Sequence, residues 1–312
     1  MNINLVKKPL LFISIFIVVA MACDMSVSVA PSTSPAALST NTVSTVSGSP
    51  TTNPPAATLV PATVVDTAQP TPVTGAAVSF WPLSVVLPPG VASGIQGSQV
   101  PRADGADLPY WGLTPGHTVL KLEGYLLQGK SHEPEIYIFP ALAYAEMTSA
   151  AFESIHRLDN ILYGPGGPLT DISEDQLPAV PFFNAQQSFA SNIQVISFQN
   201  GSGVRFLTEY AQYAVSANNS ELFYHFQGVT RDGAYYIVAI FPITAPGLAE
   251  NSEGGAVLPA GGIPYSYFAD PSFDMQAYYT DVTALLNGTS PEAFSPTLNQ
   301  LDVLIQSMRV SP

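Results

Sequence analysis

The side chains best suited to chemistry in this chain include three polar residues on neighbouring predicted strands. Arg205 and Glu209 lie in one such strand, and His225 lies in the middle of the next. Because alternate residues of a strand share a face, we expect Arg205 and Glu209 to point the same way, with His225 close by. We predict that they form a polar patch on the outer face of a sheet. A cross-strand ion pair between Arg205 and Glu221 is the simpler role for the arginine.

These residues do not complete a catalytic arrangement in the sequence. A general base needs an adjacent nucleophile and an acid that orients it, and neither accompanies His225. Ser202 and Ser220 do not lie in a nucleophile elbow. The chain also lacks a phosphate-binding Gly-Lys-Ser loop and a dinucleotide fingerprint. We therefore assign no catalytic residue and no cofactor, and treat Arg205, Glu209 and His225 as candidate ligand-binding residues.

A second group of candidates is aromatic and lies in a long predicted loop, residues 242–271. Loops of this length in compact domains are usually functional or disordered. Tyr265, Tyr267 and Phe268 lie close together in this loop, and aromatic rings offer a ligand a large contact area at low cost in conformational entropy. We predict that these three residues line a groove for a sugar or a peptide.

One further segment, His132-Glu133-Pro134-Glu135, holds three potential metal ligands. In a strand Glu133 and Glu135 point to the same face. A zinc site, however, needs three or four converging ligands, and none of the four histidines forms a spaced metal motif with another. An exposed strand entrance on an acidic protein accounts for the segment more simply, so we predict no metal site.

The composition limits the possible partners. Only 10% of the residues are charged, against about 25% in ordinary globular proteins, and the formal net charge is −14. A nucleic-acid binder needs clustered Lys and Arg to neutralise phosphates, and the nine such residues here form no cluster. Nucleic acid is therefore excluded as a partner, and electrostatic docking on anionic lipid is disfavoured. The acidic balance predicts a monomer.

The first 22 residues are arranged as a secretory signal peptide. Lys7 and Lys8 precede an apolar run over 10–20, and small residues lead to Cys23, the single cysteine of the chain. The run is too short to span a bilayer, which takes roughly 20 residues. The junction Ala20-Met21-Ala22-Cys23 resembles the lipobox of bacterial lipoproteins. That resemblance implies cleavage before Cys23 and a diacylglycerol thioether on its sulfur, which would anchor the protein on the outer face of a membrane.

The rest of the chain divides into a tether and a domain. Residues 23–77 are rich in Ser, Thr, Pro and Ala and cannot bury enough apolar surface to offset the entropy of ordering, so we predict that they are disordered. We place the extracytoplasmic domain at 78–312. Within it, 78–115 is expected to be irregular, because Pro and Gly are frequent there.

The expected fold class is α+β, an antiparallel sheet of about six strands with helices packed on one face. Alternation over 193–241, with turn signals near Asn200-Gly201 and at 230–233, predicts a meander of antiparallel hairpins. Apolar residues at three- and four-residue spacing predict helices over 149–163, 272–287 and 296–308.

Part of this region resembles a group of uncharacterised bacterial lipoproteins and secreted domains. The resemblance rests on Asn184-Ala-Gln-Gln187, Gly203-Val-Arg-Phe-Leu-Thr-Glu-Tyr-Ala-Gln212 and Phe226-Gln-Gly-Val-Thr-Arg-Asp-Gly-Ala-Tyr-Tyr236, and it implies no activity. The order of a sheet followed by terminal helices is similar to the Mog1/PsbP-like fold, a likeness that concerns architecture rather than function.

These features predict a membrane-anchored extracytoplasmic lipoprotein whose domain binds a small ligand or an envelope protein rather than acting as an enzyme. Two alternatives stay open, an extracytoplasmic hydrolase that uses acidic and aromatic loop residues, and a scaffold or assembly factor of an envelope complex. Converging carboxylates beside a buried histidine would favour the hydrolase. A flat apolar patch would favour a protein partner, and an aromatic groove without titratable groups would favour ligand capture.

Overall fold

The computed structural model of the protein describes residues 74–165, 167–180, 183–267 and 269–311. The chain divides into two units, residues 1–66 and 67–312, and all described residues belong to the second. The predicted signal peptide, the lipidation site Cys23 and the predicted tether up to residue 73 therefore lie outside the described residues.

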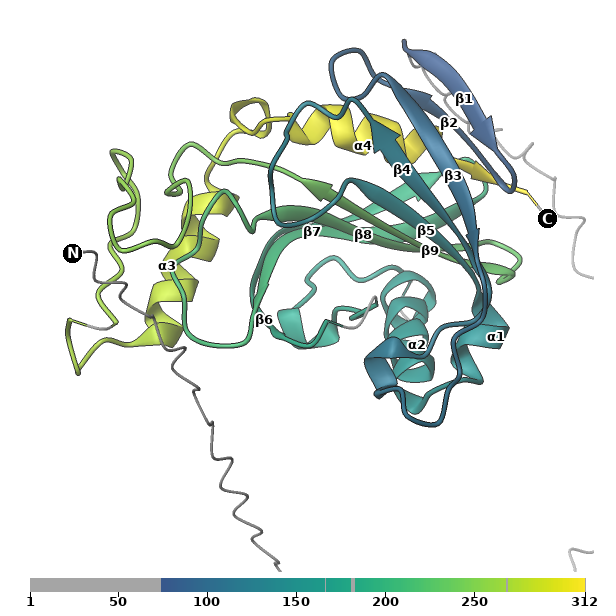
Figure 1. The fold of residues 1–312 in the computed structure, drawn as a ribbon, viewed down its shortest axis with the longest axis horizontal. Coiled ribbons are helices and arrows are strands. Elements are labelled where there is room, and N and C mark those ends of the chain that lie inside the picture. The colour runs from purple at the N-terminus through teal and green to yellow at the C-terminus, as the bar shows by residue number, and fades with distance from the viewer. Residues whose placement is uncertain (1–73, 166, 181–182, 268, 312) are drawn as a thin grey trace, which may run out of the picture. The chain divides into compact units, whose positions relative to one another are not determined.

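The described chain forms an α+β fold of ten strands and four α-helices (Figure 1). The strands are β1 (Ala76–Phe80), β2 (Leu83–Leu87), β3 (Gly94–Val100), β4 (His117–Glu123), β5 (Glu135–Pro140), β6 (Gln186–Phe198), β7 (Gly201–Ala211), β8 (Phe223–Thr230), β9 (Tyr235–Pro242) and β10 (Arg309–Val310). The helices are α1 (Ala141–Ala145), α2 (Ser149–Tyr163), α3 (Met275–Asn287) and α4 (Leu298–Ser307).

Seven strands form one antiparallel sheet in the order β3-β4-β5-β9-β8-β7-β6. The predicted meander is confirmed, because β6 to β9 are consecutive antiparallel neighbours and a tight turn at Gln199 and Asn200 joins β6 to β7. The sheet thus has one strand more than expected. In addition, β1, β2 and β10 form a separate three-stranded sheet, which joins the two ends of the described chain.

The expectation of irregular structure over 78–115 is wrong for its first part, where β1, β2 and β3 lie. Pro88, Pro89 and Gly90 come directly after β2 and end it. A segment rich in proline and glycine can therefore still contain short strands between these residues. Leu83 and Val85 alternate with exposed or half-buried neighbours and are fully buried in the core. β1 begins at Ala76, two residues before the boundary placed at 78.

Helices cover both faces of the seven-stranded sheet, so the prediction of helices on one face is wrong. Figure 1 shows α1 and α2 below the sheet and α4 above it. Alternate residues of β9 divide in the same way: Val238 and Ile240 belong to the core under α1 and α2, whereas Ala239 and Phe241 pack with α3 and α4. Because both faces are covered, every residue of β8 is buried, and strict polar alternation is lost there.

The helix predicted over 149–163 is confirmed as α2. Thr148 caps it, because its hydroxyl oxygen accepts the backbone N–H of Ala151 at 3.0 Å. Phe152 is one of the apolar residues whose spacing predicts this helix and a buried face, yet it is 58% exposed. The buried face of α2 is centred on Ala151, Ser154 and Leu158, so Phe152 lies at its margin.

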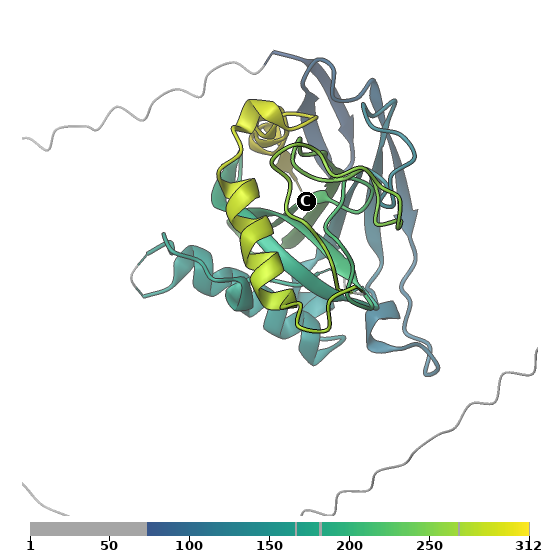
Figure 2. The ribbon, with the colours of Figure 1, turned by 90° about the vertical axis from the view of Figure 1, so that its left-hand side faces the viewer.

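The two C-terminal helices lie on the other face. α3 begins at Met275 with Asp274 as its cap, three residues after the predicted start. The apolar stripe expected in the last helix is confirmed, because Leu298, Leu301 and Leu304 of α4 are buried. Figure 2 shows α3 in front of the sheet with the loop that precedes it in the chain running alongside. This loop and α3 together shape the first cavity described below.

Candidate functional site

A cavity of about 570 Å³, here called the tyrosine cavity, lies between the loop that follows β9 and the start of α3. Its size falls within the range of about 300 to 1,000 Å³ that is typical of small-molecule sites. Rings and small polar side chains line much of it, among them those of Tyr265, Tyr267, Tyr278, Asn251, Ser252 and Glu253.

Side-chain hydrogen bonds hold the first part of the loop, although residues 243–274 contain no helix or strand where the structure describes them. Asn219 is buried, and its amide group donates to the carbonyls of Ala245 and Leu248, both at 3.1 Å. The amide oxygen of Asn219 accepts the N–H of Ala245 at 2.8 Å. These bonds satisfy backbone groups that a strand would otherwise pair, so an irregular segment can form a fixed cavity wall.

Tyr265 is the centre of the aromatic cluster. Its ring centroid lies 6.3 Å from that of Tyr267 in a stacked arrangement and 5.2 Å from that of Tyr278 in an edge-to-face arrangement. Phe273 contacts the Tyr265 ring edge to face at 5.4 Å. The hydroxyl of Tyr265 is buried and has no hydrogen-bond partner among the described residues. Buried polar atoms in native proteins are nearly always paired, so this hydroxyl is an exception within the aromatic cluster.

The cavity offers little for an anion to bind. Glu253 is the one charged side chain among the described residues that line it, and it is exposed. Asn251 and Ser252 add an amide and a hydroxyl. Carboxylates and phosphates are bound mainly by Arg, Lys or several converging N–H groups, and no basic side chain lines the described part of this cavity. Its chemistry suits an uncharged ligand that carries hydroxyl groups.

Glu209 stands behind the cavity wall rather than in it. The side chain is buried, one carboxyl oxygen accepts the N–H of Asn218 at 2.7 Å, and the other has no partner among the described residues. The preceding residue, Ala217, donates its N–H to the Tyr278 hydroxyl at 3.0 Å. Burial raises the pKa of Glu209 well above its usual value, and nearby Glu221 raises it further. Glu209 therefore positions residues 217 and 218 against α3.

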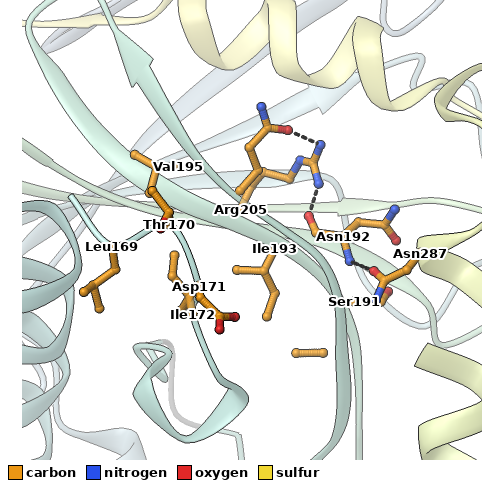
Figure 3. Close-up of a pocket in the computed structure, with 12 residues that line it drawn as sticks. Leu169, Thr170, Asp171, Ile172, Ser191, Asn192, Ile193, Val195, Arg205 and Asn287 are labelled. Atoms are coloured by element: carbon orange, nitrogen blue, oxygen red, sulfur yellow. Dashed lines mark hydrogen bonds between the residues drawn. The ribbon is translucent and has the colours of Figure 1, made fainter. Parts of the chain in front are cut away.

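A second cavity, of about 590 Å³, follows the outer edge of β6 and is here called the sheet-edge pocket (Figure 3). A β-bulge between Ser191 and Gln194 interrupts the register with β7, and Asn192 in this bulge has a φ of 51°. Short polar residues such as Asn adopt this left-handed conformation most readily. The N–H of Asn192 donates to the Asn287 side chain at 2.6 Å, and its carbonyl accepts from Arg205.

Arg205 lines this pocket, but its guanidinium already forms hydrogen bonds with neighbouring residues. Its guanidinium lies 3.2 and 3.3 Å from the two carboxylate oxygens of Asp302 and donates to the Gln194 amide oxygen at 2.8 Å. The predicted ion pair of Arg205 with Glu221 is therefore wrong. Glu221 instead accepts a hydrogen bond from the Ser131 hydroxyl at 2.5 Å.

The predicted polar patch of Arg205, Glu209 and His225 does not form. Arg205 lies opposite Phe226 in the sheet, and His225 lies opposite Phe206, so the histidine points to the other face from the arginine. Arg205 and Glu209 face α4 and α3, whereas His225 lies on the side of α2. Neither face is an outer one, because helices cover both.

His225 has a structural role on its own face. Its imidazole Nε2 lies 3.0 Å from the carbonyl of Val180, which fixes the proton on that nitrogen. The neighbouring Gln227 donates to the carbonyl of Pro178 at 2.8 Å and accepts the N–H of Val180 at 3.1 Å. Burial lowers the pKa of His225 to about 3. The neutral histidine thus helps to bind the segment 178–180 to the sheet.

The residues of the segment 132–135 are dispersed. His132 packs against the rings of Phe183 and Phe223, Glu133 forms an ion pair with Lys121 at 2.7 Å, and Glu135 accepts a hydrogen bond from Tyr137. In the part of the chain that the structure describes, no three His, Cys, Asp or Glu side chains are placed to hold a metal ion together.

Sequence reasoning found part of the tyrosine cavity and missed the sheet-edge pocket. Tyr265 and Tyr267, predicted to line a groove for a sugar or a peptide, both line the tyrosine cavity, whereas Phe268 lies outside the described residues. Tyr278 also lines the cavity, and its place in the helix predicted over 272–287 gives no signal of that role. The sequence gives one weak indication of the bulge at Ser191 and Asn192. Asparagine is uncommon in strands, so Asn192 inside a strand suggests an irregularity.

None of the α-helices in the described ranges combines the length and the apolar character that a membrane crossing requires. No protein-family model matches the chain, and comparisons with curated proteins and with solved structures gave no significant match.

Proposed function

We propose that this protein is a lipid-anchored extracytoplasmic binding protein whose tyrosine cavity takes an uncharged, hydroxyl-rich ligand such as an oligosaccharide. The observation that carries this proposal is the convergence of Tyr265, Tyr267 and Tyr278 on one cavity, together with the buried Tyr265 hydroxyl that has no partner in the described structure.

The ligand class follows from the lining. The apolar faces of sugar rings pack on aromatic rings, which supply contact area and a polar handle in one side chain. Tyr267 is 42% exposed, so a ligand at the mouth can reach its ring. Sugar hydroxyls would pair with the side chains of Asn251 and Glu253, which line the cavity. An anionic ligand would lose its hydration on binding, and no basic side chain of the described lining would compensate for that cost.

The same lining favours binding over hydrolysis. Glycoside hydrolysis commonly uses two carboxyl groups that flank the scissile bond. Among the described lining residues, Glu253 carries the one carboxylate, and Glu209 lies behind the wall, where burial raises its pKa. A buried histidine near converging carboxylates, the feature expected of a hydrolase, is also missing from the described cavity, because His225 lies on the opposite face of the sheet.

The membrane setting of the proposal rests on the sequence. Cys23 stands at the lipobox-like junction, and residues 23–75, which precede β1, have the composition of an extended tether. The net charge of −14 disfavours attachment to anionic lipid by charge alone, so we propose lipid on Cys23 as the attachment. The likeness to the Mog1/PsbP-like fold is likewise a proposal, and it concerns architecture alone.

Isothermal titration calorimetry of the full-length protein with short uncharged oligosaccharides of several linkage types tests the proposal. We expect saturable binding of at least one of them. Tyr267→Ala should weaken that binding by about tenfold, which corresponds to about 1.4 kcal/mol. Tyr163→Ala is the matched control, because Tyr163 is also exposed but lies at the end of α2. Failure of the whole series to bind, or equal weakening by both variants, would refute the proposal.

A further inference from the structure

A second hollow, of about 310 Å³, lies next to the tyrosine cavity and is here called the amide groove. We propose that the ligand of this protein is a linear, uncharged polysaccharide, one chain of which passes from the tyrosine cavity into the amide groove. This inference rests on the function proposed above and extends it, because it specifies a chain of several sugar units rather than a short saccharide.

Amide side chains are prominent in the lining of the amide groove. Residues from the start of β6, from the end of β7 and the segment after it, and from the start of α3 line it, among them Gln186, Gln187, Gln212, Gln276, Tyr213 and Tyr279. Three of the glutamines, Gln186, Gln212 and Gln276, are exposed, so their amide groups meet solvent. No charged side chain lies among the described residues of this lining. The groove therefore suits a ligand that is polar and uncharged.

Glutamine amides suit sugar hydroxyls because both groups donate and accept hydrogen bonds. A glutamine side chain offers two N–H donors and a carbonyl oxygen, and a hydroxyl offers one donor and two lone pairs. The Gln212 side chain is held in place, since its amide nitrogen donates to the carbonyl of Asn184 at 2.8 Å. Tyr213, which is 73% exposed, adds a ring on which the apolar face of a sugar can pack. The amide groove thus offers rings and uncharged polar groups, as the tyrosine cavity does.

Two chain segments line both hollows. On α3, Tyr279 lines the amide groove and Tyr278 lines the tyrosine cavity, and the centroids of these two rings are 5.3 Å apart. On the segment after β7, Tyr213 lines the groove and Ser216 lines the cavity. These two residues are three positions apart in the chain, a distance of at most about 11 Å. One extended ligand can therefore contact both hollows.

Hydrogen bonds join these two segments where the hollows meet. The hydroxyl of Tyr279 donates to the carbonyl of Val215 at 2.9 Å, and the N–H of Ala217 donates to the hydroxyl of Tyr278 at 3.0 Å. The spacing of the hollows is therefore set by contacts within the protein. A chain bound in the first hollow then reaches the second as an intramolecular step, which raises its overall affinity without any change in either hollow.

A peptide fits the amide groove less well than a polysaccharide. Extended peptides commonly bind by adding a strand along a free sheet edge, and the free edge of this sheet is the side of β6 that faces away from β7. Gln212 and Tyr213 follow β7, and Gln276 belongs to α3. The groove therefore crosses the ends of the two strands toward α3 and does not follow the free edge.

Calorimetry of the full-length protein with short and long ligands of one kind tests the inference. The probes are the disaccharide and the hexasaccharide of β-1,4-linked glucose, of α-1,4-linked glucose and of β-1,4-linked N-acetylglucosamine. For a linkage that binds, we expect one hexasaccharide per protein, with an affinity higher than that of the disaccharide by about tenfold or more.

Variants then locate the gain in affinity. Tyr213→Ala should weaken hexasaccharide binding by about tenfold and leave disaccharide binding and the urea midpoint of unfolding unchanged, because the Tyr213 ring is exposed and lines only the groove. Tyr267→Ala should weaken the binding of both lengths. Gln276→Ala should weaken the hexasaccharide alone, with Gln306→Ala as its matched control, because Gln306 is exposed on α4 and lines neither hollow.

Equal affinities for the two lengths, or a hexasaccharide affinity that neither Tyr213→Ala nor Gln276→Ala lowers, would overturn this inference and leave the proposed function standing. Two hexasaccharides per protein would also overturn it, because the hollows would then be separate sites. Tighter binding of a capped octapeptide of serine, threonine and glutamine, lost in Tyr213→Ala, would assign the groove to a peptide instead. Failure of every saccharide to bind would refute the proposed function itself and this inference with it.

Discussion

Arg205 of β7 and Asp302 of α4 form a largely buried ion pair that ties the last long helix to the centre of the sheet. The arginine Nε lies 3.2 Å from one carboxylate oxygen, and the two side chains are 7% and 14% exposed. The same oxygen accepts the Tyr224 hydroxyl at 2.9 Å. Asp302 thus satisfies two buried donors from neighbouring strands, and its removal would leave the arginine charge without its partner.

Asp302→Ala should therefore destabilise the protein by about 3 kcal/mol, because breaking a buried pair leaves an uncompensated charge. Urea unfolding of the variant measures the change. Asp281→Ala is the control, since Asp281 is exposed on α3, and its effect should stay within about 0.5 kcal/mol. Equal unfolding midpoints for the two variants would show that the Arg205–Asp302 pair does not stabilise the fold.

Because of Glu209, we predict that the free energy of unfolding decreases at higher pH. Burial raises its folded-state pKa above the ordinary 4.5, so the folded state holds the proton more tightly than the unfolded state. The stabilisation is complete below pH 4.5 and is lost as pH rises through the raised pKa, by at most about 1.4 kcal/mol per pH unit. Glu209→Gln keeps the acceptor for Asn218 and has no proton to lose.

Urea unfolding at about pH 5 and about pH 8 tests this linkage. We expect the Glu209→Gln variant and the unaltered protein to have similar free energies of unfolding at the lower pH and the variant to be more stable at the higher pH. A difference between the two proteins that does not change with pH would contradict a raised pKa for Glu209.

Because of His225, we predict that the free energy of unfolding decreases as pH falls. Burial lowers its pKa from 6.5 to about 3, so the unfolded state takes up the proton first. Its contribution to stability is complete above pH 6.5 and is lost as pH falls toward 3, again by at most about 1.4 kcal/mol per pH unit. His225→Phe leaves the Val180 carbonyl without its donor, which should cost about 1 to 3 kcal/mol at neutral pH.

The test is the difference in free energy of unfolding between His225→Phe and the unaltered protein, because the contribution of Glu209 cancels in it. This difference should shrink as pH falls below 6.5. If it stays constant from neutral to acid pH, the histidine is not held neutral by its surroundings.

We predict that the protein is attached to a membrane through Cys23. Cys23→Ser removes the sulfur that acyl chains would modify, so the variant should leave the membrane fraction or accumulate with its first 22 residues uncut. Cell fractionation and immunoblotting show either outcome, and mass spectrometry of the native N-terminal peptide should find a lipid on the cysteine. A variant that fractionates and migrates like the unaltered protein would rule out lipidation.

The sequence predicts the meander and the helices well because their signals are local. Alternation and turn residues define β6 to β9, and the spacing of Leu298, Leu301 and Leu304 defines α4. The covering of both sheet faces is not a local property. It depends on α2 packing on one face of the sheet and α3 and α4 on the other. The alternating pattern of one strand, such as 203–212, does not show which helices cover each face.

The site residues divide in the same way. Tyr265 and Tyr267 are near each other in sequence, so their proximity in the cavity could be predicted. The patch of Arg205 with His225 failed because strand register, rather than distance along the chain, decides which residues lie opposite each other. Ser191 and Asn192 were missed because a β-bulge changes the direction of side chains without a strong signature in composition.

The central claim is that the tyrosine cavity is the ligand site, and amide chemical-shift mapping of the full-length protein during titration with a short uncharged oligosaccharide tests it most directly. The account predicts shifts concentrated in residues 251–267 and around Tyr278, and their loss in Tyr267→Ala. Shifts centred on another surface, or none at an oligosaccharide concentration that saturates the calorimetric signal, would contradict it.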